Sequence, residues 1–125
     1  MEEVGIINFS EVGSETGSIF EGKFKVKTLL SRRDQFVSDE KRRFVLGNDS
    51  QAAPPALQGE AYMIAELSVR ILEAPAWWTN SNSGLDLVDE NLIPLLFEAC
   101  LKEEKKRKEE LKDKAKKALE QLAKG

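Results

Sequence analysis

Few residues in this sequence have the types and spacing that catalysis requires. Histidine is absent from all 125 residues, which removes the most common general base and the partner of a Ser-His or Cys-His nucleophile pair. The sequence also lacks a glycine-rich loop of the kind that binds phosphate groups. These observations favour a binding protein over an enzyme, and they predict no catalytic residue and no cofactor.

A lone thiol and a group of carboxylates are the other side chains that could do chemistry. Cys100 falls in an apolar helical stripe, where a thiol is more often a small hydrophobic side chain than a nucleophile. Asp86, Asp89 and Glu90 could suggest a Ca²⁺ or Mg²⁺ site, but they lack the spacing and the glycine of an EF-hand loop. Capping of the following helix by Asp89 or Asn91 is the favoured role, so we predict no metal site.

Basic side chains between residues 23 and 43 raise the possibility of nucleic-acid binding. They are Lys23, Lys25, Lys27, Arg32, Arg33, Lys41, Arg42 and Arg43. However, Asp34, Asp39 and Glu40 are interleaved with them, and no DNA- or RNA-binding signature is present. Nucleic-acid binding is therefore the least favoured of the functions considered.

Two adjacent tryptophans, Trp77 and Trp78, are the most informative local feature for binding. Neighbouring residues point in different directions in a helix or strand, so one indole is expected to face outward or along a groove if the other packs on the core. An exposed tryptophan is a typical anchor of a protein interface. The alternative is that both indoles cover the open end of the core.

The charge divides the chain at about residue 101. Residues 1–101 carry 9 basic and 16 acidic side chains, a net charge of −7, whereas residues 102–125 carry 10 basic and 6 acidic ones, a net charge of +4. We expect one globular domain over residues 1–101 and a charged helical tail over residues 102–125. A weak apolar stripe in the tail is a second predicted partner-binding surface, formed by Leu111, Ala115, Ala118 and Leu122. The alternative is a solvated helix whose charges pair among themselves.

The longest helical pattern runs from Ala56 to Glu73 and ends before Pro75. Leu57, Ile64 and Ile71 belong to its apolar stripe, and the narrow remaining face carries Glu66, Arg70 and Glu73, which we expect to contact water. This helix is predicted to form the centre of the core. No apolar run approaches the roughly 20 residues that span a bilayer, and the acidic N-terminus differs from a signal peptide, so we predict a protein without membrane contact.

The remaining elements are read from periodicity and capping residues. Residues 4–7 could be a short strand, and residues 20–27 alternate apolar and charged side chains, which predicts a strand. Ser31 is a predicted N-cap for a helix that ends at Gly47 and has a core-facing stripe of Leu30, Val37 and Phe44. Residues 48–55 are expected to be a linker, with Pro54 or Pro55 at the first turn of the central helix. We predict an α+β fold with an N-terminal β-hairpin or small antiparallel sheet, a three-helix core and a projecting C-terminal helix.

The order of these segments resembles a family of phage proteins. The similarity rests on FEGKFKVKTLLSRRDQFVSDEKRRFVLG, then AELSVRILEAPAWW, then SGLDLVDENLI before a charged helix. Over residues 18–101 this combination resembles the tail assembly chaperones of long-tailed bacteriophages.

The resemblance implies a small non-enzymatic protein of the host cytoplasm. Its expected partners are the tape measure protein and the tail tube subunits, and it is expected to be absent from the mature virion. A virion structural or adaptor protein is the alternative, and a homo-oligomer remains open. The resemblance supplies no binding residues, so the tryptophans and the tail stripe are predictions from the residues themselves.

Overall fold

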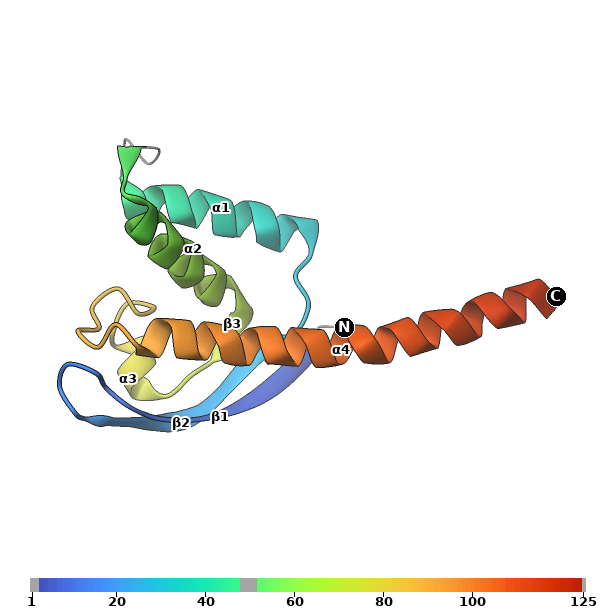
Figure 1. Cartoon of the computed structure of the whole chain (residues 1–125), viewed down its shortest axis with the longest axis horizontal. Helices are drawn as coiled ribbons and strands as arrows, with labels where there is room; N and C mark the ends of the chain where they lie inside the picture. The colour runs from blue at the N-terminus through green and yellow to red at the C-terminus, as the bar shows by residue number, and fades with distance from the viewer. Residues whose placement is uncertain (1–2, 48–51, 125) are drawn as a thin grey trace.

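The structure, a computed structural model, describes residues 3–47 and 52–124 and has an α+β fold (Figure 1). Its sheet contains three antiparallel strands in the order β1-β2-β3. β1, Val4–Val12, and β2, Ile19–Lys27, pair along their whole length. In β2, Phe24 and Val26 are buried while Glu21 and Lys23 are exposed. The alternation predicted for this strand is confirmed, and the short N-terminal strand proves to be longer than expected.

Helix α1, Arg32–Leu46, begins and ends at the predicted residues. The Ser31 side chain accepts a hydrogen bond from the Asp34 amide, and the Asp34 side chain accepts one from the Ser31 amide, which forms a capping box. Gly47 closes the other end with a φ of 89°. The prediction of a core-facing stripe is wrong, because Val37 and Phe44 are exposed and α1 packs against the second helix through a different side.

The central helix, α2, is shorter than predicted and spans Pro55–Arg70. Pro55 occupies its first turn, as expected, but residues Ile71–Glu73 form strand β3, which pairs with β2. The chain before Pro75 is biased toward extended geometry, and pairing with β2 gives the backbone of β3 hydrogen-bond partners that a helix end would lack. The first half of the linker predicted before this helix, residues 48–51, lies outside the described residues.

The assignment of a water-facing side on this helix is also wrong. Glu66 and Arg70 are buried, with 8% and 1% of their surface exposed, whereas Leu57 is 53% exposed. The helix therefore presents charged side chains to its neighbours and an apolar one to solvent near its start. The contacts that Arg70 makes with other elements explain why this charged side of the helix is buried.

A single helical turn, α3, Ala76–Thr79, follows Pro75, and the long helix α4, Leu92–Lys124, completes the chain. Pro94 lies in the first turn of α4, where its missing N–H costs little. α4 packs against β1 and α2, and its C-terminal half extends away from the body (Figure 1). The expectation that residues 102–110 project freely is wrong for the first turns, because Glu104 and Arg107 form ion pairs with the body.

The hydrophobic core lies between the sheet, α2, α3 and α4. Its buried members are Ile7, Phe9, Phe24, Val26, Ile64, Leu67, Trp78, Leu92, Ile93, Leu96 and Cys100. Burying a side chain of this kind contributes roughly 1.5–3 kcal/mol relative to its exposure. The core therefore fixes the sheet to α2 and α4, and α1 is attached mainly through α2.

Candidate protein-binding surfaces

The two adjacent tryptophans both pack against the sheet. Trp78 is buried in the core, and the Trp77 ring lies 5.1 Å from the Phe20 ring and 5.8 Å from the Phe9 ring, centroid to centroid. The Trp77 Nε1 donates a hydrogen bond to the carbonyl oxygen of Glu21 at 3.1 Å. The prediction that one indole faces freely outward is therefore wrong. The two indoles hold the segment after Pro75 against the β-hairpin. This arrangement agrees with the alternative expectation, in which both indoles cover the core.

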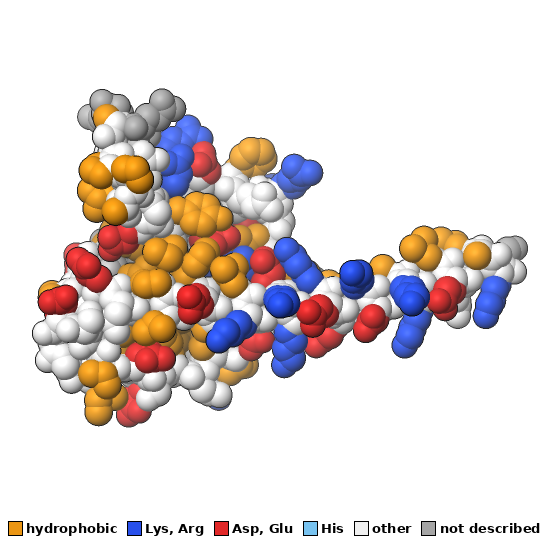
Figure 2. Space-filling model, in the orientation of Figure 1, with side chains coloured by type: hydrophobic (Ala, Val, Ile, Leu, Met, Phe, Trp, Pro, Cys, Tyr) orange, Lys and Arg blue, Asp and Glu red, His pale blue; other side chains and the backbone are white. Residues whose placement is uncertain are grey.

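The predicted apolar stripe of the tail lies on the projecting part of α4. Leu111 is partly buried, whereas Ala115, Ala118 and Leu122 are exposed. Figure 2 shows hydrophobic side chains gathered along one side of the end of this helix. Leu122, with 78% of its surface exposed, and Leu119, with 66%, are the large side chains of this surface. The tail stripe lies on the projecting end of α4, whereas the two tryptophans lie in α3 and pack against the sheet. The structure therefore does not combine the two predicted surfaces into one site.

The outer face of α1 is an exposed aromatic surface, and two of its residues, Val37 and Phe44, belong to the stripe predicted to face the core. Phe36 and Phe44 are 74% and 77% exposed, and Val37 beside them is 49% exposed. The two phenylalanines are eight residues apart and thus lie on one side of the helix. Lys41 places its Nζ 5.6 Å from the centre of the Phe44 ring. Exposed apolar side chains grouped in this way are typical of a surface that binds another protein.

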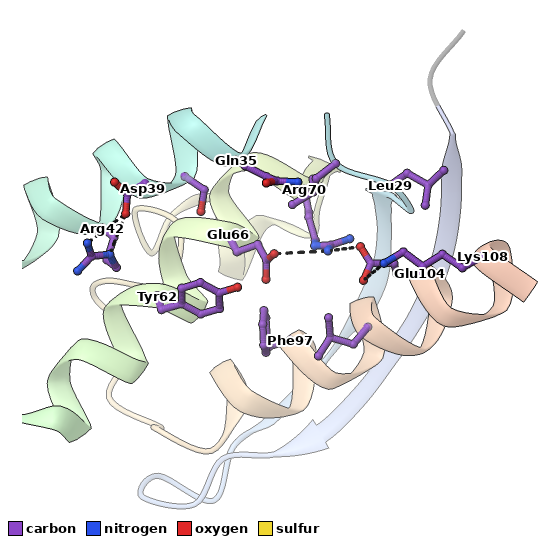
Figure 3. A pocket seen from close by; sticks show the side chains of 13 residues that line it. Leu29, Gln35, Asp39, Arg42, Tyr62, Glu66, Arg70, Phe97, Glu104 and Lys108 are labelled. Carbon is purple, nitrogen blue, oxygen red and sulfur yellow. Dashed lines mark hydrogen bonds and ion pairs between the residues drawn. The ribbon is translucent and has the colours of Figure 1, made fainter. Parts of the chain in front are cut away.

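A cleft of about 610 Å³ opens between α1, α2 and α4 on the side of α1 that faces the body. Figure 3 shows Arg70 at its base, between Glu66 of the same helix and Glu104 of α4. The Arg70 Nη2 donates to Glu104 Oε1 at 2.8 Å and lies 3.5 Å from Glu66 Oε1. Its Nη1 donates to the carbonyl oxygens of Lys27 and Thr28. Arg70 therefore joins α2, α4 and the chain that follows β2.

The buried carboxyl group of Glu66 shapes the electrostatics of this cleft. Burial raises its pKa, and the attraction of Arg70 only partly opposes that effect. Glu66 Oε2 has no hydrogen-bond partner among the described residues. Tyr62 and Phe97 form an edge-to-face pair at the mouth, with ring centroids 6.0 Å apart. The cleft can hold an apolar side chain against these rings.

Asp89 and Asn91 bind the β-hairpin loop, and neither acts as the predicted side-chain cap of α4. Asp89 Oδ1 accepts hydrogen bonds from the amides of Glu15 and Thr16, both at 2.7 Å, and Oδ2 accepts one from the Thr16 hydroxyl. Asn91 bonds the Ser14 amide and the Val12 carbonyl oxygen. These contacts join residues more than 70 positions apart, so the capping interpretation was wrong. Burial acts to raise the pKa of Asp89, but the bonds from Thr16 and Glu15 outweigh it and lower the pKa.

Replacing Asp89 with Ala is expected to release the hairpin loop while the core remains folded. Two backbone amides would lose their acceptor, so hydrogen exchange at Glu15 and Thr16 should become at least about tenfold faster. Exchange measured by NMR at individual amides would test this, with the core amide of Phe24 as the internal control. Unchanged exchange at Glu15 and Thr16 would show that Asp89 does not hold the loop.

Cys100 is fully buried against the core, as the sequence predicted for a thiol in an apolar stripe. Burial raises the pKa of the thiol to about 12. Because the thiolate is the reactive form, we expect the folded protein to show no reaction with a thiol reagent at pH 8 and full reaction in denaturant. Absorbance of the released chromophore would measure this, and rapid labelling of the folded chain would contradict the buried position.

Two of the five basic side chains of α1, Arg42 and Arg43, pair with an acidic neighbour. Arg42 bonds Asp39 at 3.0 Å, and Arg43 bonds the second oxygen of the same carboxylate. Hydrogen bonds from Arg43 and then Arg42 lower the pKa of Asp39. Lys27 likewise bonds Asp34 at 3.1 Å. These pairs reduce the positive charge that α1 and β2 could present to a phosphate backbone.

Arg70 is the residue whose role the sequence reading missed most clearly. It follows Glu66 by four residues within an otherwise apolar run, and such a pair can form either on a wet surface or in a buried position. The signal that could have identified it is a later carboxylate pair, Glu103 and Glu104, at the end of the apolar part of the last helix. Only the fold brings Glu104 to Arg70.

The described part of the chain also bears on metal binding and on membrane insertion. Among residues 3–47 and 52–124 no group of three or more cysteine or acidic side chains is placed to hold a metal ion. None of the helices formed by these residues is both long and apolar enough to cross a membrane. Comparison with protein-family models, with curated proteins and with solved structures found no match for this chain.

Proposed function

We propose that this protein is a non-enzymatic tail assembly chaperone of a long-tailed phage, which binds helical segments of the tape measure protein and the tail tube subunits. The observation that carries the proposal is the outer face of α1, where Phe36 and Phe44 are both more than 70% exposed. The sequence resemblance to that family over residues 18–101 supplies the identity of the partners.

The chemistry of this face suits an amphipathic helix as ligand. A helix that packs on α1 would insert its own side chains between Phe36 and Phe44, which stand two turns apart. Covering two phenylalanines removes a large apolar area from water without requiring a catalytic group. A tape measure protein is long and helical before the tube forms around it, so its apolar stripes need such a cover during assembly.

Co-expression with the tape measure and tube proteins encoded beside it, followed by affinity capture, tests the proposal. We expect both partners to be retained at physiological salt and lost with Phe36→Ser and Phe44→Ser combined. Val12→Ser with Ile19→Ser is the matched control, because these aliphatic side chains are 57% and 69% exposed and face each other at the end of the β-hairpin. The control variant should retain both partners.

Two results would overturn the proposal. Failure of the wild-type chain to retain either partner would remove the chaperone function. Recovery of the chain in intact, purified virions would favour a structural or adaptor component of the tail, since a chaperone is released before the particle matures.

A further inference from the structure

A groove with apolar walls lies where α1 ends and α2 begins. It has a volume of about 280 Å³ and is bordered by the end of α1, the first half of α2 and the loop that precedes α4. Leu57 and Leu85 are its most exposed large side chains, at 53% and 37%. Its charged lining residues are Glu60, Asp89 and Glu90, and none of the described residues around it is basic. The groove is thus apolar and acidic.

The tail of α4 has the opposite character. From Leu111 to Lys124 it carries five lysines and two acidic side chains. At about 100° per residue, Leu111, Leu119 and Leu122 fall on one side of the helix. Lys112 and Lys114 flank that side, whereas the acidic Asp113 and Glu120 fall on the opposite one. The tail is therefore an amphipathic helix whose exposed apolar stripe is bordered by lysines.

The groove and the tail of one molecule cannot meet. Ile93 at the start of α4 lines the groove, and Leu111 lies 18 residues later in the same unbroken helix, which places it about 27 Å farther along the axis. Figure 1 shows the tail extending away from the end of the body where α2 and the loop before α4 lie. Any tail that enters this groove must belong to another chain.

We propose that the tail of one molecule binds the groove of a second copy, with the leucine stripe on the apolar walls and the flanking lysines beside Glu60 and Glu90. The opposite charges favour this arrangement over pairing of two tails, which would bring lysines against lysines. Binding of a tail in a groove is a head-to-tail contact. A dimer formed in this way has one groove and one tail still free, so further molecules can add to form a filament or a closed ring. This self-association uses a surface separate from the outer face of α1, where the tape measure protein is proposed to bind.

Sedimentation of the purified full chain over a range of concentrations tests this association. We expect the average mass of the wild type to rise with concentration. A tail variant, Leu119→Ser with Leu122→Ser, and a groove variant, Leu57→Ser with Leu85→Ser, should each associate at least about tenfold more weakly. Lys117→Ser with Gln121→Ser is the matched control, because it places two serines away from the stripe on the same helix and should associate like the wild type.

Mixing the two variants distinguishes the possible arrangements. The tail variant keeps an intact groove and the groove variant keeps an intact tail, so an equimolar mixture should form a heterodimer that does not grow further. Circular dichroism and thermal unfolding would confirm that both variants remain folded, since all four leucines are exposed.

Three results would overturn the proposal. A wild type that stays monomeric at all concentrations would exclude the association. A groove variant that associates like the wild type, together with a tail variant that does not, would show that the tails pair with each other. A mixture without heterodimer would show that the two surfaces do not bind one another. None of these results bears on capture of the tape measure protein.

Discussion

Replacing Arg70 with Ala is expected to lower the free energy of unfolding by about 3–5 kcal/mol. The guanidinium is 1% exposed and bonds Glu104, Glu66 and two backbone carbonyl oxygens. Its removal would leave Glu66 in the cleft without its cation, Glu104 with only the exposed Lys108 at 3.5 Å, and two carbonyl groups without this donor. An unpaired buried charge costs more than the pair contributed, because the charge has lost its hydration and gained nothing in return.

Urea unfolding followed by circular dichroism would measure this loss, and Arg43→Ala is the matched control. Arg43 also pairs with a carboxylate, Asp39, but its side chain is 64% exposed. Exposed pairs contribute little, so the control should change the unfolding free energy by less than about 0.5 kcal/mol. Equal losses in the two variants would contradict a structural role specific to the buried arginine.

A second variant separates the charge from the packing of the side chain. Arg70→Met combined with Glu66→Gln and Glu104→Gln removes all three charges while keeping similar volumes. Because replacing a whole buried ionic group by uncharged side chains is often neutral, this triple variant should be more stable than Arg70→Ala. Both variants lack the hydrogen bonds to the Lys27 and Thr28 carbonyl oxygens, so a triple variant that is no more stable than Arg70→Ala would show that the uncompensated carboxylates do not cause the loss.

The elements that depend on local signals were predictable from the sequence. The strand at Ile19–Lys27 follows from strict alternation, and α1 follows from Ser31 and Gly47 as caps. Both signals act within a few residues, so they hold whatever the rest of the chain does. The α+β class was predictable for the same reason.

The side that each helix turns toward the core was not predictable in this way. In α2 the helical pattern places Glu66 and Arg70 on the polar face, yet Glu104 and the carbonyl groups after β2 make burial of that face favourable. In α1 the apolar Phe36 and Phe44 suggest a core face, yet α1 lies at the edge of the molecule. Periodicity identifies a face, but only tertiary contacts decide whether a partner covers it.

The candidate binding surfaces also differ in whether they depend on local sequence or on contacts between distant residues. The tryptophans were predicted to bind a partner, whereas their contacts in the structure are with Glu21 and Phe20, more than 50 residues earlier. The tail stripe depends only on the spacing of residues within one helix, and the structure places it in solvent as expected. Surfaces on one element can be predicted from its sequence, whereas a contact between distant elements requires the fold.

Removing residues 102–125 is expected to destabilise the body by about 1.5–3 kcal/mol, the usual value for a hydrogen bond to a charged group. This truncation deletes Glu104, which lies 2.8 Å from Arg70, and Arg107, which lies 2.9 Å from Glu3. A fully solvated tail, the alternative considered for this segment, would instead predict almost no change on truncation. The ion pairs of its first two turns reverse that expectation.

A shorter truncation, after Glu110, supplies the matched control. It keeps Glu104 and Arg107 and removes mainly exposed residues beyond them, so the unfolding free energy should change by less than about 0.5 kcal/mol. The full-length variant Glu104→Gln should lose most of the unfolding free energy that removal of residues 102–125 costs. Such a result would assign that loss to the bond between Glu104 and Arg70.

Chemical unfolding of the three proteins beside the wild type therefore locates the boundary between body and tail. Equal stability of the two truncated chains would place the boundary at Leu101 and would show that Arg70 does not depend on Glu104. Because the proposed contact of the tail with a second copy would add stability that rises with protein concentration, the comparison is made at a concentration at which the chain is monomeric. A large loss on truncation after Glu110 would then mean that the tail stabilises the body of its own molecule.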